Sequence, residues 1–169
     1  LSKLEEAVKT FPDYFDALSL LGRELVLMKN YEKAYPYLLR AIDVNPKSFS
    51  CFFRLGYAFY QLKQYAAAAK AAAAAAILAP DSADTQLLLG TVARINGDLQ
   101  DAERALTKAN TFAKGKSSEV HWQLALLLNR LQRNREAIME LETFLKLEPN
   151  SPEKAKIQAL IVKLRSTAK

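Results

Sequence analysis

Proline is scarce in this chain, and its spacing is the feature that most limits what the chain can fold into. Pro12, Pro46 and Pro80 lie 34 residues apart, and Pro149 follows Pro80 by 69 residues, which is two such periods plus one residue. A fixed period of this length is typical of proteins built by stacking one small structural element many times. The spacing therefore predicts a repeat array.

A small residue after a leucine recurs with the same period. The pairs are Leu21-Gly22, Leu55-Gly56, Leu89-Gly90 and Leu124-Ala125, and a second column holds Ala34, Ala68, Ala102 and Ala137. Further apolar residues follow at spacings of three, four and seven, which places them on one face of a helix. Each repeat is thus predicted to contain two amphipathic helices, with the small residues where the helices approach closely.

Regular breaks separate these helices. Polar tripeptides divide each repeat into two, namely KNY at 29–31, KQY at 63–65, NGD at 96–98 and QRN at 132–134. Between repeats a proline or glycine is followed by a serine, which is a favourable residue for capping a helix N-terminus. These serines are Ser48, Ser82, Ser117 and Ser151. Each repeat is therefore predicted to be a helical hairpin.

The segment from Phe52 to Pro80 carries an aromatic residue, Leu-Gly, further aromatic residues, spaced alanines and a proline in that order. This pattern resembles the tetratricopeptide repeat (TPR) family. The resemblance implies an all-α, right-handed superhelical solenoid of antiparallel helix hairpins. The third repeat departs from the pattern, because Lys114 and Gly115 stand where proline is expected and one residue is inserted.

Four full repeats are expected from this resemblance, at 15–48, 49–82, 83–117 and 118–151. Residues 1–14 match the second helix of a truncated repeat, so we expect the chain to be part of a larger protein. Residues 152–169 are expected to form a capping helix with Pro152 in its first turn.

Composition argues against several classes of site. With one cysteine, Cys51, and one histidine, His121, the chain can form neither an internal disulfide nor a multi-ligand Cys/His metal site. It has no Gly-rich phosphate loop and no nucleophile with a recognisable base partner, so we expect neither catalysis nor a cofactor. No apolar run approaches the roughly 18 residues of a membrane helix.

The net charge of +6 raises the question of nucleic-acid binding. Most of the excess lies in the last helix, where Lys154, Lys156, Lys163, Arg165 and Lys169 outnumber Glu153. Because most of the excess lies in this end helix, we do not expect a nucleic-acid partner, and because no long apolar run is present we do not expect membrane insertion.

Cys51 and His121 each allow two interpretations. His121 shares a column with Leu18, Phe52 and Gln86, which favours a packing role over a functional one. Cys51 lies beside Phe52 at a helix start, which favours a small, semi-buried filler. The alternative for Cys51 is a thiol activated by the helix N-terminus.

In TPR proteins the first helices of the repeats line a concave groove that binds peptides, and the resemblance implies the same here. The core columns of the second repeat are already filled by Phe52, Leu55, Phe59 and Leu62. We therefore expect the remaining aromatic residues, Phe53, Tyr57 and Tyr60, to face this groove. The other interpretation is that these three rings pack against neighbouring helices. A chaperone-tail adaptor is not expected, since Asp84 would repel a C-terminal carboxylate. The full set of expected groove residues is Arg23, Phe53, Tyr57, Tyr60, Leu87, Thr91, Arg94, Trp122, Leu126 and Asn129.

The sequence thus predicts a non-catalytic protein–protein interaction scaffold that binds a peptide segment of a protein partner. Two alternatives stay open. One is a homo-oligomer formed by stacking of repeat ends, through the apolar face around Leu4 and Ala7. The other is a regulatory array attached to an enzyme.

The run YAAAAKAAAAAAILAP, residues 65–80, contains ten alanines between Ala66 and Ala76. The period makes it the second helix of the second full repeat, with Ala68, Ala72 and Ala75 in fixed core columns. Ala72 is unusual because the sister repeats carry leucine there, and the outward positions are alanine as well. We interpret part of the run as not natural sequence, either an engineered helix or longer side chains recorded as alanine.

Overall fold

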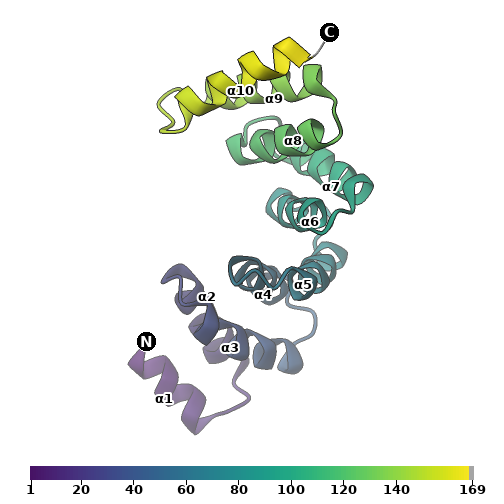
Figure 1. Ribbon diagram of the computed structural model, residues 1–169. Coiled ribbons are helices and arrows are strands. Elements are labelled where there is room, and N and C mark those ends of the chain that lie inside the picture. Colours follow the sequence, from purple (N-terminus) through teal and green to yellow (C-terminus); the bar gives the residue numbers. More distant parts are fainter. Residues whose placement is uncertain (168–169) are drawn as a thin grey trace. The chain divides into compact units, whose positions relative to one another are not determined.

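The structure is a computed structural model that describes residues 1–167 (Figure 1). These residues contain ten helices and no strand, and the chain divides into two compact units, Leu1–Pro80 and Asp81–Lys169. The N-terminal unit comprises α1 (Ser2–Thr10), α2 (Phe15–Leu27), α3 (Tyr31–Val44), α4 (Phe49–Gln61) and α5 (Tyr65–Leu78). The C-terminal unit comprises α6 (Ala83–Asn96), α7 (Leu99–Phe112), α8 (Ser118–Arg130), α9 (Asn134–Leu147) and α10 (Lys154–Thr167).

The helix starts reproduce the period of the sequence. Helices α2, α4, α6 and α8 begin 34, 34 and 35 residues apart, and α3, α5, α7 and α9 follow the same steps. Each of the pairs α2–α3, α4–α5, α6–α7 and α8–α9 packs as a helical hairpin. From these starts we propose the repeats 15–48, 49–82, 83–117 and 118–151 for the folded chain.

Serine side chains cap three of the four first helices. Ser48 Oγ accepts from the backbone N–H of Cys51 at 3.4 Å, Ser82 Oγ from Thr85 at 3.3 Å and Ser117 Oγ from Val120 at 3.4 Å. These bonds satisfy donors that the first turn of a helix leaves without an intrahelical partner. The prediction that these serines mark helix starts is confirmed.

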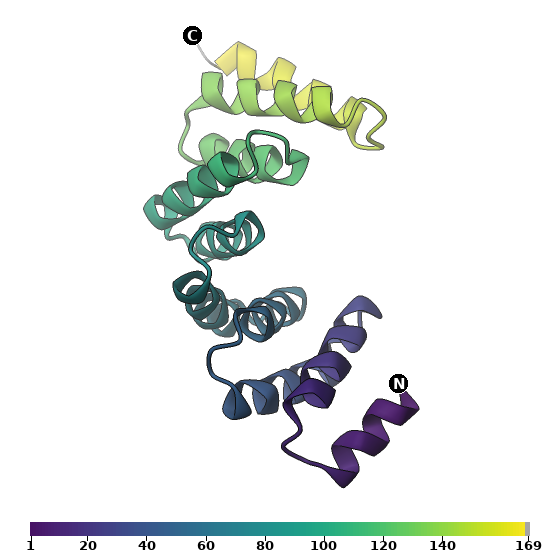
Figure 2. The same cartoon turned by 180° about the vertical axis from the view of Figure 1, so that it is seen from behind.

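The last helix begins later than expected. Ser151 Oγ accepts from Glu153 N at 3.2 Å, and this turn holds Pro152 outside the helix, which starts at Lys154. Helices α9 and α10 lie side by side in both views of the ribbon (Figures 1 and 2). The expected cap at 152–169 also includes Ala168 and Lys169, which lie outside the described residues.

Every hairpin turn between paired helices contains one residue in the left-handed region. These residues are Lys29, Lys63, Gly97 and Gln132, with φ between 59° and 95°. The next residue in each turn donates its N–H back to the carbonyl five positions earlier, as Asn30 does to Leu25 at 2.8 Å and Arg133 does to Leu128 at 2.9 Å. This is the Schellman arrangement, which usually has glycine at the left-handed position.

Small residues bring the paired helices together, as the sequence predicts. A Cβ added to Gly22 would lie 2.6 Å from Leu38 Cδ2, and a Cβ added to Gly90 would lie 2.7 Å from Leu106 Cγ. Both leucines are fully buried. The absence of a side chain at these glycines therefore sets the distance between the helices.

Each unit has its own buried cluster. In the N-terminal unit, one side of α5 contributes only alanines to the interior. Ala68, Ala72 and Ala75 are fully buried, as expected from their columns, whereas Ala66 and Ala73 face solvent. Ile77 on the same helix is 81% exposed. The buried leucines and small residues of α2, α3 and α4 provide most of the N-terminal cluster, and those of α7–α10 provide the C-terminal one.

Candidate functional site

Helix α4 carries the aromatic residues predicted for the groove. Its buried side is formed by Cys51, Leu55, Gly56 and Ala58, whereas Phe53, Tyr57 and Tyr60 are only partly buried. On α2, Arg23 is exposed and donates from Nε and Nη2 to Glu24 Oε1 at 3.1 and 2.7 Å. The N-terminal unit thus presents aromatic rings and a guanidinium on its first helices.

Four tyrosines form a continuous series of ring contacts. Tyr31 meets Tyr57 edge to face with ring centroids 6.1 Å apart, Tyr57 meets Tyr60 at 6.5 Å, and Tyr60 meets Tyr65 at 6.3 Å. Such aromatic pairs contribute about 0.5–1.5 kcal/mol beyond the area they bury. We call Tyr31, Tyr57, Tyr60 and Tyr65 the tyrosine cluster; it joins the starts of α3 and α5 to the face of α4.

Two members of this cluster, Tyr31 and Tyr65, were not among the residues predicted for the groove. Tyr31 and Tyr65 end the KNY and KQY breaks, 34 residues apart, so their shared column was a usable signal. Leu99 and Asn134 take the corresponding positions at the starts of α7 and α9. Burial raises the pKa of Tyr31, and the nearby Tyr57 hydroxyl, with which it makes a hydrogen bond, raises that pKa further. Tyr31 is therefore neutral at physiological pH.

The six groove residues predicted in the C-terminal unit differ in their burial and in their contacts. Thr91 is 5% exposed and is part of the interior. The Trp122 ring packs against Phe144 of α9, with centroids 5.7 Å apart. The other four, Leu87, Arg94, Leu126 and Asn129, are partly buried.

Arg94 is held by a residue that sequence analysis did not select. Its Nε and Nη2 donate to Gln123 Oε1 at 3.2 and 2.9 Å, and Gln123 Nε2 donates to Glu119 Oε1 at 2.7 Å. Gln123 is 5% exposed, so both ends of its amide are satisfied inside the protein. The Arg94 carbonyl accepts from Arg130 Nη1 at 2.7 Å. These bonds fix the orientation of Arg94 on α6.

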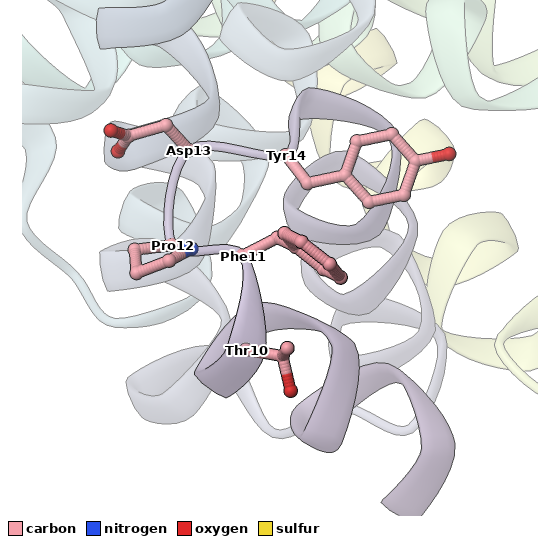
Figure 3. Close-up of a pocket in the computed structure, with 5 residues that line it drawn as sticks. All are labelled: Thr10, Phe11, Pro12, Asp13 and Tyr14. Atoms are coloured by element: carbon pink, nitrogen blue, oxygen red, sulfur yellow. The ribbon is translucent and has the colours of Figure 1, made fainter.

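A pocket of about 590 Å³ lies at the connection between α1 and α2 (Figure 3). The rings of Phe11 and Tyr14 lie on one side of this connection, and Pro12 and Asp13 on the other. Phe11 is 64% and Tyr14 is 51% exposed, so the pocket has an open aromatic edge. The Pro12 carbonyl accepts from Arg40 Nη2 on α3, which fixes the connection to the rest of the unit.

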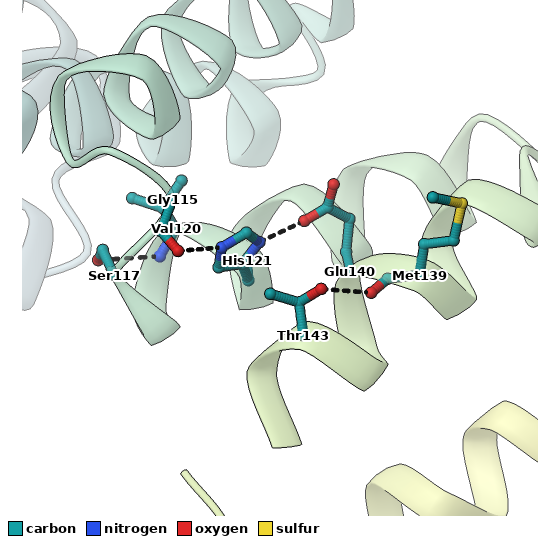
Figure 4. A network of polar contacts seen from close by, with 7 residues as sticks. All are labelled: Gly115, Ser117, Val120, His121, Met139, Glu140 and Thr143. Atoms are coloured by element: carbon teal, nitrogen blue, oxygen red, sulfur yellow. Dashed lines mark hydrogen bonds and ion pairs between the residues drawn. The ribbon is translucent and has the colours of Figure 1, made fainter. Parts of the chain in front are cut away.

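Cys51 and His121 are both buried. Cys51 is fully buried, deeper than the semi-buried position expected, which supports a packing role. His121 is 5% exposed, as a packing residue should be, yet its two ring nitrogens make polar contacts with Glu140 and Gly115 (Figure 4). The residues at the equivalent position of the other repeats predicted that His121 is buried, but nothing in the sequence predicted these two contacts.

Residues 1–167 contain no group of three or more His, Cys, Asp or Glu side chains that could hold a metal ion. In the same part of the chain, no helix combines the length and the apolar character that a membrane crossing requires.

The helices define the class of the protein. It is an all-α protein of antiparallel helix hairpins repeated every 34–35 residues. Profiles of the tetratricopeptide repeat match residues 20–83, 53–115 and 118–151. The chain therefore belongs to the tetratricopeptide repeat family. A comparison with curated protein sequences finds no match.

Solved structures confirm the fold. YrrB, described as a TPR protein with an unusual peptide-binding site, is 14% identical over 98% of this chain and 83% of its own, with a TM-score of 0.81. MamA 41-end from Desulfovibrio magneticus RS-1 is 21% identical over 88% of this chain and 84% of its own, with a TM-score of 0.79. TTC0263, a thermophilic TPR protein of Thermus thermophilus, is 20% identical over 94% and 87%, with a TM-score of 0.73. The predicted all-α solenoid is confirmed, and its fold is that of a protein–protein interaction scaffold.

Proposed function

We propose that the chain is a non-catalytic scaffold that binds a peptide segment of a protein partner on the first helices of its repeats. The observation that carries the proposal is the tyrosine cluster on and beside α4. In the N-terminal unit the contact surface comprises Arg23, Phe53, Tyr57 and Tyr60. YrrB, which shares this fold, is described as having a peptide-binding site, and this supports the same class of ligand here.

Partial burial makes the rings of α4 suitable anchors. Cys51, Leu55, Gly56 and Ala58 are the buried residues of this helix, whereas Phe53, Tyr57 and Tyr60 keep part of their surface accessible. Contact between rings restricts their rotation, so binding a peptide costs little further side-chain entropy. Tyrosine also keeps a hydroxyl for hydrogen bonding, and it is one of the residue types enriched in interface hot spots.

The C-terminal unit contributes four accessible residues to the proposed binding surface. Arg94 is oriented by Gln123, and Leu87, Leu126 and Asn129 are partly accessible. Two further residues are proposed for the groove, Thr91 and Trp122. Thr91 is buried and Trp122 packs against Phe144, so both act mainly by positioning the helices that line the groove. We expect their substitution to change binding through the position of α6 and α8.

Fluorescence anisotropy with a labelled peptide library tests the proposal. For a peptide that binds the parent chain, Tyr57→Ala and the double variant Phe53→Ala/Trp122→Ala are expected to weaken binding about tenfold or more, as loss of an anchor typically does. Tyr14→Ala is the matched control, because Tyr14 is an exposed tyrosine on the α1–α2 connection. Unchanged affinity in both test variants would reject the proposed surface.

Self-assembly is the second candidate, and one observation favours it. Phe11 and Tyr14 are 64% and 51% exposed at the connection between α1 and α2, where they line the pocket at Thr10–Tyr14. Exposed apolar residues in a group are typical of surfaces that bind another chain. Light scattering over a concentration series tests this: a mass that stays monomeric at high concentration rejects it, and a mass that rises in the parent and not in Phe11→Ser supports it.

A further inference from the structure

The tyrosine cluster has a geometry that suits one class of peptide. Its four rings lie in series, with neighbouring centroids 6.1 to 6.5 Å apart and neighbouring planes tilted against each other by 42–73°. All four residues are only partly buried, so each keeps part of its surface accessible. The N-terminal unit therefore offers a ligand a row of aromatic rings along one line.

The spacing of the rings matches an extended peptide in the polyproline II conformation. This conformation rises about 3.1 Å per residue, so two residues advance about as far as one step between neighbouring rings. The three steps of the cluster therefore correspond to about six residues of such a peptide. Proline holds this conformation before binding, because its ring fixes φ, and proline-rich segments dock on surfaces lined by aromatic side chains.

The hydroxyls of the cluster favour a ligand with free carbonyl groups. Tyr31 and Tyr57 form a hydrogen bond with each other through their side chains. One hydroxyl donates in this bond, and the one that accepts keeps its own proton for a further acceptor. A polyproline II segment has no internal hydrogen bonds, so its carbonyls can accept from this hydroxyl. The carbonyls of a helical peptide are already bonded within the helix.

The charge around the cluster opposes a cationic ligand. Segments 29–33 and 57–65, which carry the four tyrosines, contain three lysines and one carboxylate, all of them exposed. These residues are Lys29, Lys33, Lys63 and Glu32. On α2, Arg23 is paired with Glu24, so this pair adds no net charge. A lysine or arginine side chain of a ligand can bind the face of a tyrosine ring, but here it would meet a surplus of positive charge.

Two of these lysines mark the ends of the ring series. The series begins at Tyr31 and ends at Tyr65, and Lys29 and Lys63 stand two residues before them. Both lysines take the left-handed position of a hairpin turn, with φ of 59°. A segment that lies along the rings would therefore have an exposed ammonium group near each of its ends, where carboxylates are favoured.

We infer that the tyrosine cluster binds a short proline-rich segment flanked by acidic residues. This inference rests on the proposed function, because it names the class of peptide for the surface on α4. The prolines pack on the four rings, and one tyrosine hydroxyl donates to a carbonyl of the segment. Lys29 and Lys63 attract the flanking carboxylates.

Fluorescence anisotropy at low ionic strength tests the class of ligand with three labelled peptides. The first has six prolines with two aspartates on each side, the second has alanines in place of the prolines, and the third has lysines in place of the aspartates. We expect the alanine peptide to bind at least about tenfold more weakly than the first, because ring contacts and the preformed conformation are both lost. The lysine peptide should bind about fivefold more weakly. Equal or tighter binding of either comparison peptide would overturn the inference.

Two leucine variants test whether the rings carry the binding. Tyr57→Leu keeps an apolar side chain within the series but removes an aromatic face, so affinity for the proline–aspartate peptide should fall about three- to tenfold. Tyr35→Leu is the matched control, because Tyr35 is also partly buried and packs on Phe59, with centroids 5.5 Å apart, outside the tyrosine cluster. An equal loss in the two variants would contradict binding at the cluster.

The double variant Lys29→Gln/Lys63→Gln tests the charged ends. Gln132 takes the same left-handed place in the turn between α8 and α9, with φ of 60°, so the fold accepts glutamine there. The preference for aspartate over lysine flanks should shrink to about twofold or less in this variant. A preference as large as in the parent chain would assign the charge effect to other groups and overturn this part of the inference.

The same measurements separate this inference from the proposed function. If the proline peptides do not bind while another library peptide loses affinity in Tyr57→Ala, the class of ligand is wrong and the peptide-binding surface stands. If no library peptide loses affinity in Tyr57→Ala or in Phe53→Ala/Trp122→Ala, both proposals are rejected.

Discussion

Substitution of Gly22 by alanine gives the sharpest test of how the paired helices pack. The new Cβ would lie 2.6 Å from Leu38 Cδ2 and 2.7 Å from Leu38 Cγ, whereas apolar carbons normally approach to about 3.5–4.0 Å. Leu38 is fully buried and cannot swing into solvent. Overpacking of this kind costs about 1–3 kcal/mol, and alanine regains about 1 kcal/mol through its higher helix propensity. We expect a net loss of up to about 2 kcal/mol in the free energy of unfolding.

The repeats provide an internal ranking for this effect. A Cβ at Gly90 would meet Leu106 Cγ at 2.7 Å and also the Leu106 backbone nitrogen at 3.0 Å, where the corresponding distance for Leu38 N is 3.6 Å. Since backbone moves less readily than a side chain, Gly90→Ala should cost more than Gly22→Ala. The period sets Ala72 opposite Gly56, so Gly56→Ala should be neutral or stabilising by up to about 1 kcal/mol.

Urea unfolding followed by circular dichroism measures these differences as shifts in midpoint at constant slope. The decisive comparison uses Leu38→Ala, which alone should cost about 2–5 kcal/mol by leaving a cavity. In that background Gly22→Ala should become stabilising, because the clash is gone and only the helix propensity remains. The reasoning is refuted if Gly22→Ala stabilises the parent chain, or if it has the same sign in both backgrounds.

Turn geometry, thiol burial and tyrosine ionisation each give a further prediction. Left-handed backbone disfavours a side chain, so Gln132→Gly should stabilise the chain by about 0.5–1 kcal/mol and Gly97→Ala should destabilise it by about 1 kcal/mol. The same unfolding assay measures both changes. Equal changes in stability for the two variants would contradict this prediction. Cys51 is fully buried, so a thiol reagent should react with it only after denaturation, and rapid labelling of the native chain would show a different structure at α4. Burial raises the pKa of Tyr31 above its ordinary value of 10.0, so the folded state holds this proton more tightly than the unfolded chain does. Stability should therefore fall as the pH rises above 10, and Tyr31→Phe should lose less stability there than the parent; an equal loss in both would contradict the assignment.

The helices and their pairing could be predicted because they depend on residue types that recur at fixed positions. Leucines followed by a small residue, serines between repeats and polar breaks are local signals, and four copies of each remove most of the ambiguity that one copy would leave. The start of α10 was missed by two residues because Ser151 caps a turn that includes Pro152, and the sequence alone does not distinguish that turn from the first turn of a helix.

The side-chain contacts of the candidate site were less predictable. Tyr31 and Gln123 belong to different columns from the residues selected, and their contacts join helices that are distant in sequence. His121 was assigned to the interior from its column, which is correct, but its partners come from the irregular α7–α8 connection and from α9. Such contacts depend on the rotamers of both partners and on one inserted residue, and no repeat pattern encodes them.

The alanines of α5 have a consequence for the order in which the chain folds. Burying an alanine costs no side-chain conformational entropy, and alanine is the best helix former. Most of the residues in α5 are alanine, whereas its partner α4 must immobilise several large aromatic rings. We therefore expect α5 to become helical early, before its neighbours have packed, and to act as a template on which α4 docks. The helix with the smallest side chains in the protein would then help to set the rate at which the N-terminal unit forms.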